Sequence, residues 1–160
     1  MAKYRQGELK LVFNFDIIYW RGHKKVGLRR SHKLVMRIAI GNDVVYIPDF
    51  KKSLTPAFKK RVYTRTEIEQ IEEYKADPLV RYATTWAAKE AVIKALKQLL
   101  GDSSKFNLKE IEIIRNSKIP SVKISSRQFK HLSFSLSLSH DGDYAFGVAL
   151  AYATRRGSGD

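Results

Sequence analysis

The sequence predicts one domain of the α+β class, and two stretches of the chain support this prediction. The alanine-rich run after Asp77-Pro78 predicts a single helix up to about Leu100. Residues 131–152 alternate apolar residues with serines, turn at Asp141-Gly142 and return as a second apolar run, which predicts an antiparallel hairpin. With 160 residues, of which 44% are hydrophobic, the chain can form one compact core.

Shorter apolar runs predict further strands. Residues 36–47, MRIAIGNDVVYI, combine β-branched and apolar residues on both sides of Gly41-Asn42-Asp43, so the carboxylate of Asp43 is placed in apolar surroundings. Residues 108–114 and 121–126 predict two short strands joined by a turn.

The segment between the first strand and the long helix predicts one or two helices over residues 54–76. Thr55 before Pro56 has the pattern of a helix start. Thr64, with Glu67 three residues later, has the pattern of a capping box, which predicts where a second helix begins.

The chain is strongly basic, and the excess is unevenly distributed. Thirty Lys and Arg residues against 16 Asp and Glu give a net charge of +14, which attracts acidic partners of any kind. Residues 1–35 hold nine basic and two acidic residues, a net charge of +7, and include the run LVFNFDIIYW, which is compatible with a strand or a short helix. We interpret residues 1–35 as an extension of unknown role, residues 36–154 as the domain and residues 155–160 as a tail.

The composition excludes several kinds of site. The chain has no cysteine, so disulfides and thiolate zinc sites are excluded, and any metal must bind oxygen or histidine. A cysteine-free chain suits a reducing compartment, and we predict a cytoplasmic protein. No stretch is long and apolar enough to predict a membrane span.

The long predicted helix carries a carboxylate and an ammonium one turn apart. At 3.6 residues per turn, Trp86, Glu90 and Lys94 share one face. One interpretation is an i,i+4 ion pair on a solvated face, which contributes about 0.2–0.5 kcal/mol. The other is that Glu90 binds a metal ion and Lys94 a phosphate, with Asp43 as the second metal ligand. For Asp43 the alternative is an acid that caps a turn at the strand end.

Four stretches occur in a distinctive order: IGNDVV, FKKRVYTRTEI, WAAKEAVIKAL and SLSLSHDGDYAFGVALA. Together, with their spacing, they resemble the holo-[acyl-carrier-protein] synthase family of phosphopantetheinyl transferases. The resemblance covers roughly residues 36–152 and no part of residues 1–35. It implies an α+β fold in which one long helix packs on a small, mainly antiparallel sheet.

The resemblance also implies an activity. Members of this family transfer 4′-phosphopantetheine from coenzyme A to a serine of an apo acyl carrier protein with the aid of Mg²⁺, for fatty acid biosynthesis, and leave adenosine 3′,5′-bisphosphate. By position, Asp43 and Glu90 are expected to bind Mg²⁺ and to act in catalysis, and Lys94 to contact the phosphates. The residues expected near the nucleotide end of coenzyme A are Ser137, Ser139 and His140. The alternation of side chains along a strand also allows another interpretation, in which His140 closes the core at the strand end and the serines form the polar face of the strand.

This chain departs from the family pattern at three places. Thr85 stands where relatives carry an arginine before the aromatic residue of the helix motif, only Gly101 remains of a Gly-Thr-Gly loop after the helix, and Asp49 takes the place of an arginine used to dock the carrier protein. The residues that we still expect to dock an acidic carrier protein are Phe58, Arg61, Lys51, Lys52 and Arg65. Their alternatives are a core position for Phe58 and a solvated face for the basic residues.

The strand motif with Asp43 and the helix motif with Glu90 each occur once in the chain. In the family that this chain resembles, one copy corresponds to half of a pseudo-dimeric unit, and three chains form a ring. The resemblance therefore predicts a homotrimer whose sites lie between neighbouring chains.

Two other functions compete with the transferase. The charge of residues 1–35 is compatible with a basic nucleic-acid-binding module, although no such motif is present and nucleic acid is not the expected partner. The missing Gly-Thr-Gly loop is compatible with a relative that binds carrier protein without catalysis.

Overall fold

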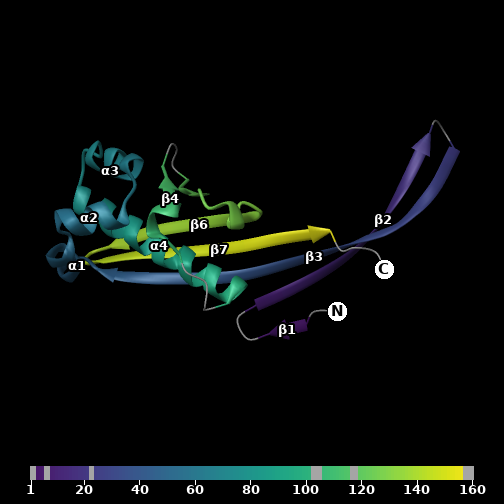
Figure 1. Ribbon diagram of the computed structural model, residues 1–160, viewed down its shortest axis with the longest axis horizontal. Helices are drawn as coiled ribbons and strands as arrows, with labels where there is room; N and C mark the ends of the chain where they lie inside the picture. The colour runs from purple at the N-terminus through teal and green to yellow at the C-terminus, as the bar shows by residue number, and fades with distance from the viewer. Residues whose placement is uncertain (1–2, 6–7, 22–23, 102–105, 116–118, 157–160) are drawn as a thin grey trace.

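A computed structural model of the chain describes residues 3–5, 8–21, 24–101, 106–115 and 119–156 (Figure 1). The elements follow in this order: β1 (Lys3–Arg5), β2 (Glu8–Arg21), β3 (Lys24–Tyr46), α1 (Ile47–Ser53), α2 (Pro56–Val62), α3 (Arg65–Glu72), α4 (Pro78–Leu100), β4 (Ile111–Ile114), β5 (Ser121–Ile124), β6 (Leu132–Asp141) and β7 (Tyr144–Arg156). An antiparallel sheet with the order β1-β2-β3-β7-β6 forms the base of the fold, and β4 and β5 form a separate pair. Within the described ranges, no helix has both the length and the apolar character needed to cross a bilayer.

The α+β fold predicted from the sequence is confirmed, and the local signals act as expected. Asp77 caps α4 by accepting a hydrogen bond from the Leu79 N–H, and Gly142, at φ 51°, forms the turn between β6 and β7. The run over residues 54–76 forms two helices: Thr55 caps α2, and Thr64 and Glu67 form the complete capping box of α3.

Helix α4 lies across one face of the sheet, over β3 and β7 (Figure 1). Its C-terminal half shares an apolar cluster with β4, β6 and β7, and its N-terminal half shares a second cluster with α1, α2 and α3. An alanine stripe, which includes Ala87, Ala91 and Ala95, is fully buried at this contact. The long helix therefore joins two cores, and its small residues let it approach the sheet closely.

Two glycines on the sheet are required for this approach. A Cβ on Gly41 would lie 2.0 Å from the carbonyl oxygen of Ala91, and a Cβ on Gly147 would lie 2.6 Å from that of Ala87. Both neighbours are backbone atoms of α4, so a side chain could be accommodated only by moving the helix away from the sheet.

We therefore expect Gly147→Ala to lower the free energy of unfolding by about 1–3 kcal/mol, since overpacking against a backbone forces the elements apart. Gly41→Ala is expected to cost more because the approach is closer. Urea unfolding at one fixed protein concentration measures both, with Ser135→Ala at an exposed position of β6 as the control. An unchanged midpoint for Gly147→Ala would show that the contact is not tight.

The sheet continues across the predicted boundary at Met36. β3 runs without a break through this position, and β2 pairs with it from Leu9 opposite Ile38 to Arg21 opposite Lys24. LVFNFDIIYW thus forms a strand, and the β2–β3 pair extends beyond α4 (Figure 1). At the other end, β7 continues to Arg156, so the first two residues of the predicted tail pair with β3.

Candidate functional site

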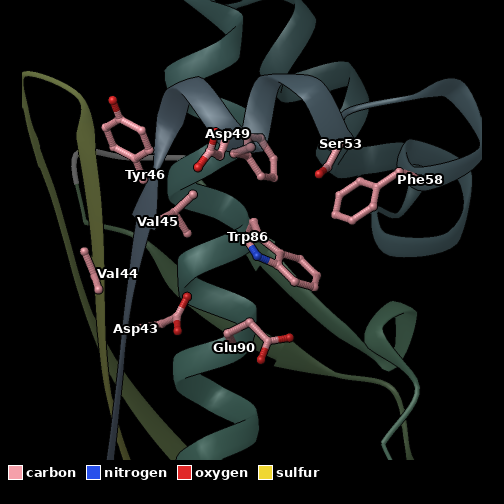
Figure 2. A pocket seen from close by; sticks show the side chains of 10 residues that line it. Asp43, Val44, Val45, Tyr46, Asp49, Ser53, Phe58, Trp86 and Glu90 are labelled. Atoms are coloured by element: carbon pink, nitrogen blue, oxygen red, sulfur yellow. The ribbon is translucent and has the colours of Figure 1, made fainter.

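A cavity of about 450 Å³ opens where the end of β3 meets α1, α2 and α4. Asp43 enters it from β3 and Glu90 from α4, with Trp86 one turn before Glu90 (Figure 2). The remaining lining residues come from the β3 end, α1 and α2: Val44, Val45, Tyr46, Asp49, Phe50, Ser53 and Phe58. The two carboxylates predicted to share a metal ion thus lie in the same cavity.

The close contact of α4 with the sheet positions this pair. Gly41 precedes Asp43 by two residues, so both lie on the face of β3 that α4 covers. Ala91, whose carbonyl meets Gly41, directly follows Glu90. The same approach that requires glycine therefore brings Asp43 next to the turn of α4 that carries Glu90.

Asp43 and Glu90 interact electrostatically with each other and with the ammonium group of Lys94. Lys94 Nζ lies 2.7 Å from Asp43 Oδ1, in an ion pair whose lysine is half exposed. Partial burial raises the pKa of Glu90 above its usual value, and the negative charge of Asp43 raises it further, while Lys94 opposes the shift. A cation between the carboxylates would offset both the burial and the repulsion.

The donor set fits Mg²⁺. In the part of the chain that the structure describes, no three His, Cys, Asp or Glu side chains gather as a metal cage. Mg²⁺ commonly uses one or two carboxylates, and takes its other oxygens from water and substrate phosphates. Asp43 and Glu90 at an open cavity provide this arrangement.

An aromatic wall forms the other side of the cavity. The Phe58 ring packs edge-on against Trp86 with centroids 5.2 Å apart, and against Phe50 at 5.9 Å. Phe58 is half-buried, so it combines a packing contact with a position on the cavity surface.

The basic residues predicted to dock a carrier protein are exposed: Lys51 and Lys52 on α1, Arg61 on α2 and Arg65 on α3. The Arg61 guanidinium lies 5.7 Å from the centre of the Phe58 ring, next to the aromatic wall. Lys52 pairs with Asp49 at 2.7 Å, so the acid that replaces the expected arginine is partly neutralised by its own helix.

A buried ion pair fixes the rotation of α4. Lys89 Nζ lies 2.8 Å from Glu67 Oε2, and the two side chains are 0% and 1% exposed. Lys89 also donates to the carbonyls of Leu108 and Ile111, and Glu67 accepts from the Ile113 N–H. Because Lys89 points into this network, the next residue, Glu90, faces the cavity.

We expect Glu67→Gln to destabilise the protein by about 3–5 kcal/mol, because it leaves the Lys89 ammonium buried without a counter-charge. The double variant Glu67→Leu/Lys89→Met removes both charges and is expected to recover most of the loss. Chemical unfolding of the two variants measures the difference. Equal destabilisation by both variants would contradict the view that the unpaired charge is the cause.

The three predicted hairpin residues do not all line the same cavity. Ser139 and His140 line a second cavity of about 410 Å³ together with Arg81, Thr84, Arg115, Pro120 and Leu138. Ser137 is exposed on the face of β6 opposite Leu136, and the lining of this cavity does not include it. His140 is exposed at the strand end and does not close the core.

Sequence patterns did not reveal Arg81 or Arg115. Arg81 lies one helical turn before Thr85, a spacing that could have drawn attention to it. Arg115 follows β4 and reaches Thr85 only through the fold: its Nη1 donates to Thr85 Oγ1 at 2.7 Å. Beyond Gly101, which ends α4 at φ 103°, residues 102–105 of the expected substrate loop lie outside the described residues.

Comparison with known proteins places this architecture in a family. Residues 39–149 match the protein-family model of the 4′-phosphopantetheinyl transferase superfamily. The chain is 35% identical to the holo-[acyl-carrier-protein] synthase of Chlamydia caviae over 117 residues, which cover 69% of this chain and 93% of the relative. It is 37% identical to that of Wolbachia pipientis wMel over 125 residues, or 74% of this chain and 98% of the relative.

Solved structures agree with the sequence relatives. The ACPS–CoA complex of Chronobacterium ammoniagenes superposes with a TM-score of 0.65 and 28% identity, and covers 74% of this chain and 98% of its own. The Helicobacter pylori holo-[acyl-carrier-protein] synthase in complex with coenzyme A gives a TM-score of 0.57 and 27% identity. This match covers 70% of this chain and 98% of the Helicobacter pylori chain. The chain therefore belongs to the 4′-phosphopantetheinyl transferase superfamily, as a member similar to the holo-[acyl-carrier-protein] synthases.

Proposed function

We propose that this protein transfers 4′-phosphopantetheine from coenzyme A to a serine of an apo acyl carrier protein, in a Mg²⁺-dependent reaction that serves fatty acid biosynthesis. The observation that supports this most directly is the convergence of Asp43 and Glu90, from separate elements, in one cavity with an aromatic wall. The family to which the chain belongs supports the same reaction.

In this reaction the serine hydroxyl attacks the phosphorus that carries the pantetheine arm. The bond from that phosphorus to the bridging oxygen of the pyrophosphate breaks, and adenosine 3′,5′-bisphosphate leaves. Asp43 and Glu90 would hold Mg²⁺, which would supply positive charge to the phosphate groups of coenzyme A. Glu90, whose side chain lines the same cavity, would also accept the serine proton. Lys94, which forms an ion pair with Asp43, would offer a positive charge to the leaving phosphates.

We propose that the protein works as a homotrimer. The sheet face opposite α4 carries exposed apolar side chains on adjacent positions of β3 and β7, a group that we call the outer stripe: Ile40, Val44, Tyr46, Tyr144, Phe146 and Val148. Val44 pairs with Phe146 and Tyr46 with Tyr144 across the strands, so the side chains form one continuous surface. A contiguous apolar surface of this kind indicates a protein contact, and a second copy of the chain is the occupant we propose.

We propose that the carrier protein docks on α1, α2 and the start of α3. Lys51, Lys52, Arg61 and Arg65 are exposed on these helices, and the net charge of +14 adds long-range attraction for an acidic partner. We propose a cytoplasmic location for this reaction, which suits a chain without cysteines.

An intact-mass assay tests the function. An apo acyl carrier protein incubated with coenzyme A, Mg²⁺ and this protein is expected to gain the mass of phosphopantetheine, and a carrier with its acceptor serine changed to alanine is not. Chelation of Mg²⁺ is expected to stop the reaction. No mass gain, together with binding of the apo carrier protein, would instead identify a non-catalytic member of the family.

A thermal-shift comparison addresses the nucleic-acid alternative. Coenzyme A with Mg²⁺ is expected to raise the melting temperature, because a ligand that binds only the folded state stabilises it. Stabilisation by a random oligonucleotide without any effect of coenzyme A would favour the nucleic-acid-binding module.

A further inference from the structure

β2 and the first half of β3 form a pair of strands that precedes the family match. The match to the family model begins at residue 39. β2 pairs with β3 from Leu9 opposite Ile38 to Arg21 opposite Lys24, and the pair extends beyond α4 (Figure 1). We call residues 8–21 of β2 and 24–38 of β3 the arm. Its contribution is therefore additional to the part of the fold that defines the family.

The arm receives little support from the core in the part of the chain that the structure describes. β2 makes extended contacts only with β1 and β3, and β1 pairs only with residues 8–10 of β2. On the other side, β7 pairs with β3 only from residue 34 onward. Most of the arm is thus two-stranded, and an isolated two-stranded pair is at best marginally stable in water. We therefore expect another surface to cover it.

Contacts with α4 fix which way the residues of β3 face. Arg37 Nη2 donates to the carbonyl of Leu99 at 2.6 Å, and Ala39 belongs to the apolar cluster that β3 shares with α4. Side chains alternate between the two faces of a strand, so the even-numbered positions of β3 lie on the sheet face opposite α4. The pairing of β3 with β7 shows no register shift over residues 34–46, so this alternation extends to position 34.

The sheet face opposite α4 is apolar where the arm leaves the domain. Residues directly opposite each other in an antiparallel pair share a face. Three such pairs lie here: Phe13 with Leu34, Leu11 with Met36 and Leu9 with Ile38. The same row of β3 continues with Ile40 and Val44 of the outer stripe, which are 57% and 54% exposed. The outer stripe therefore continues into the arm without a charged residue.

The basic residues at this level of the arm occupy the other face. Lys10 pairs with Arg37, and Asn14 with Lys33. A phosphate backbone would bind this basic face, whereas the apolar face is stabilised by contact with another apolar surface. Because the apolar face of the arm is continuous with the outer stripe, a copy of the chain that packs on the outer stripe would lie beside the arm.

We infer that the apolar face of the arm packs on a neighbouring copy of the chain and extends the subunit contact of the outer stripe. This inference rests on the homotrimer proposed above and adds to it an element that lies outside the family match. The neighbour supplies the cover that a two-stranded pair lacks. The arm thus strengthens the assembly and takes no part in the chemical step.

Phe13→Asp tests this contact in the full chain. We expect the dissociation constant of the assembly to rise about tenfold or more, because the carboxylate would be buried among apolar groups. Asn14→Asp is the matched control: it adds the same charge at the next position, on the other face, and is expected to change the constant by no more than about twofold. Phe13→Leu, which stays apolar, is expected to behave like the wild type.

Sedimentation velocity over a dilution series measures these dissociation constants. A wild-type constant for Phe13→Asp, or an equal rise for Asn14→Asp, would overturn the inference. A wild-type protein that is monomeric at all concentrations would overturn it as well.

A cross-link locates the contact even if Phe13→Asp disturbs the arm itself. The chain has no cysteine, so Leu11→Cys provides a single attachment point for benzophenone maleimide. In assemblies formed from a mixture of isotope-labelled and unlabelled protein, irradiation is expected to join labelled to unlabelled copies. Asn14→Cys, on the other face, is expected to give fewer such links. Links confined to one chain, or equal links from both positions, would contradict the contact.

Two other occupants of the apolar face predict different results. Binding of the wild type to vesicles of phosphatidylcholine and phosphatidylglycerol that Phe13→Asp abolishes, with unchanged assembly, would assign the face to a lipid surface. The same result with a random oligonucleotide would assign it to nucleic acid. Either result would overturn the subunit contact.

The arm contact and the transferase can fail separately. A protein that assembles through the arm in both tests, yet transfers nothing to the carrier protein, would retain the contact and refute the transferase. A protein that transfers phosphopantetheine, but whose assembly is unaffected by Phe13→Asp, would retain the transferase and refute the contact.

Discussion

Glu90→Gln is expected to lower kcat/KM for phosphopantetheine transfer by about 100-fold or more, because in the reaction that we propose Glu90 is both a metal ligand and the acceptor of the serine proton. The amide keeps the size of the side chain but can neither neutralise a cation nor accept this proton. Asp43→Asn is expected to raise the Mg²⁺ concentration needed for half-maximal rate, since one of two protein ligands loses its charge.

The intact-mass assay at varied Mg²⁺ measures both effects. Glu73→Gln is a suitable control, because this exposed glutamate at the end of α3 lies outside both cavities. A Glu90→Gln variant with wild-type turnover would refute the assignment. A variant that loses activity and also binds no Mg²⁺ would show that metal binding accounts for the loss.

Phe146→Asp is expected to convert the trimer that we propose to monomers and to abolish most of the transfer activity. Phe146 lies within the outer stripe, 45% exposed in the single chain, and in the assembly a carboxylate there would be buried among apolar groups without a partner. If the outer stripe instead faces water in solution, the same substitution should change stability by no more than about 0.5 kcal/mol.

Light scattering of the wild type and the variant measures the assembly. The control is Ile119→Asp, which introduces the same charge at an apolar side chain that is 76% exposed but lies outside the outer stripe. A trimer that survives Phe146→Asp would show that the outer stripe is not the subunit contact. A monomeric variant with full activity would show that the site is complete within one chain.

Local sequence determined much of this fold. The starts of α2, α3 and α4 follow from Thr55, Thr64 and Asp77, because a capping side chain acts on amides only two or three residues away. The β6–β7 hairpin follows from the alternation of apolar residues and serines together with the Asp141-Gly142 turn, since strand period and turn chemistry are also local. Glu90 and Asp43 could be singled out because each carboxylate occurs in an apolar run.

Only the tertiary structure showed how these pieces meet. The contact of Gly41 with Ala91 spans 50 residues of sequence, and no local pattern indicates that α4 lies close enough to exclude a Cβ. The same holds for Lys89, because its buried partners, Glu67 and the carbonyls of Leu108 and Ile111, come from other parts of the chain.

The sequence by itself therefore determined which residues have the chemistry for the site, since side-chain type, helical spacing and turn signals act over a few residues. The tertiary structure decided which of them come together. It united Asp43 with Glu90, left Ser137 outside the cavity that Ser139 and His140 line, and brought Arg115 to Thr85 across 30 residues. It also extended the sheet through Met36 into β2, because strand pairing depends on a partner that the strand's own sequence does not specify.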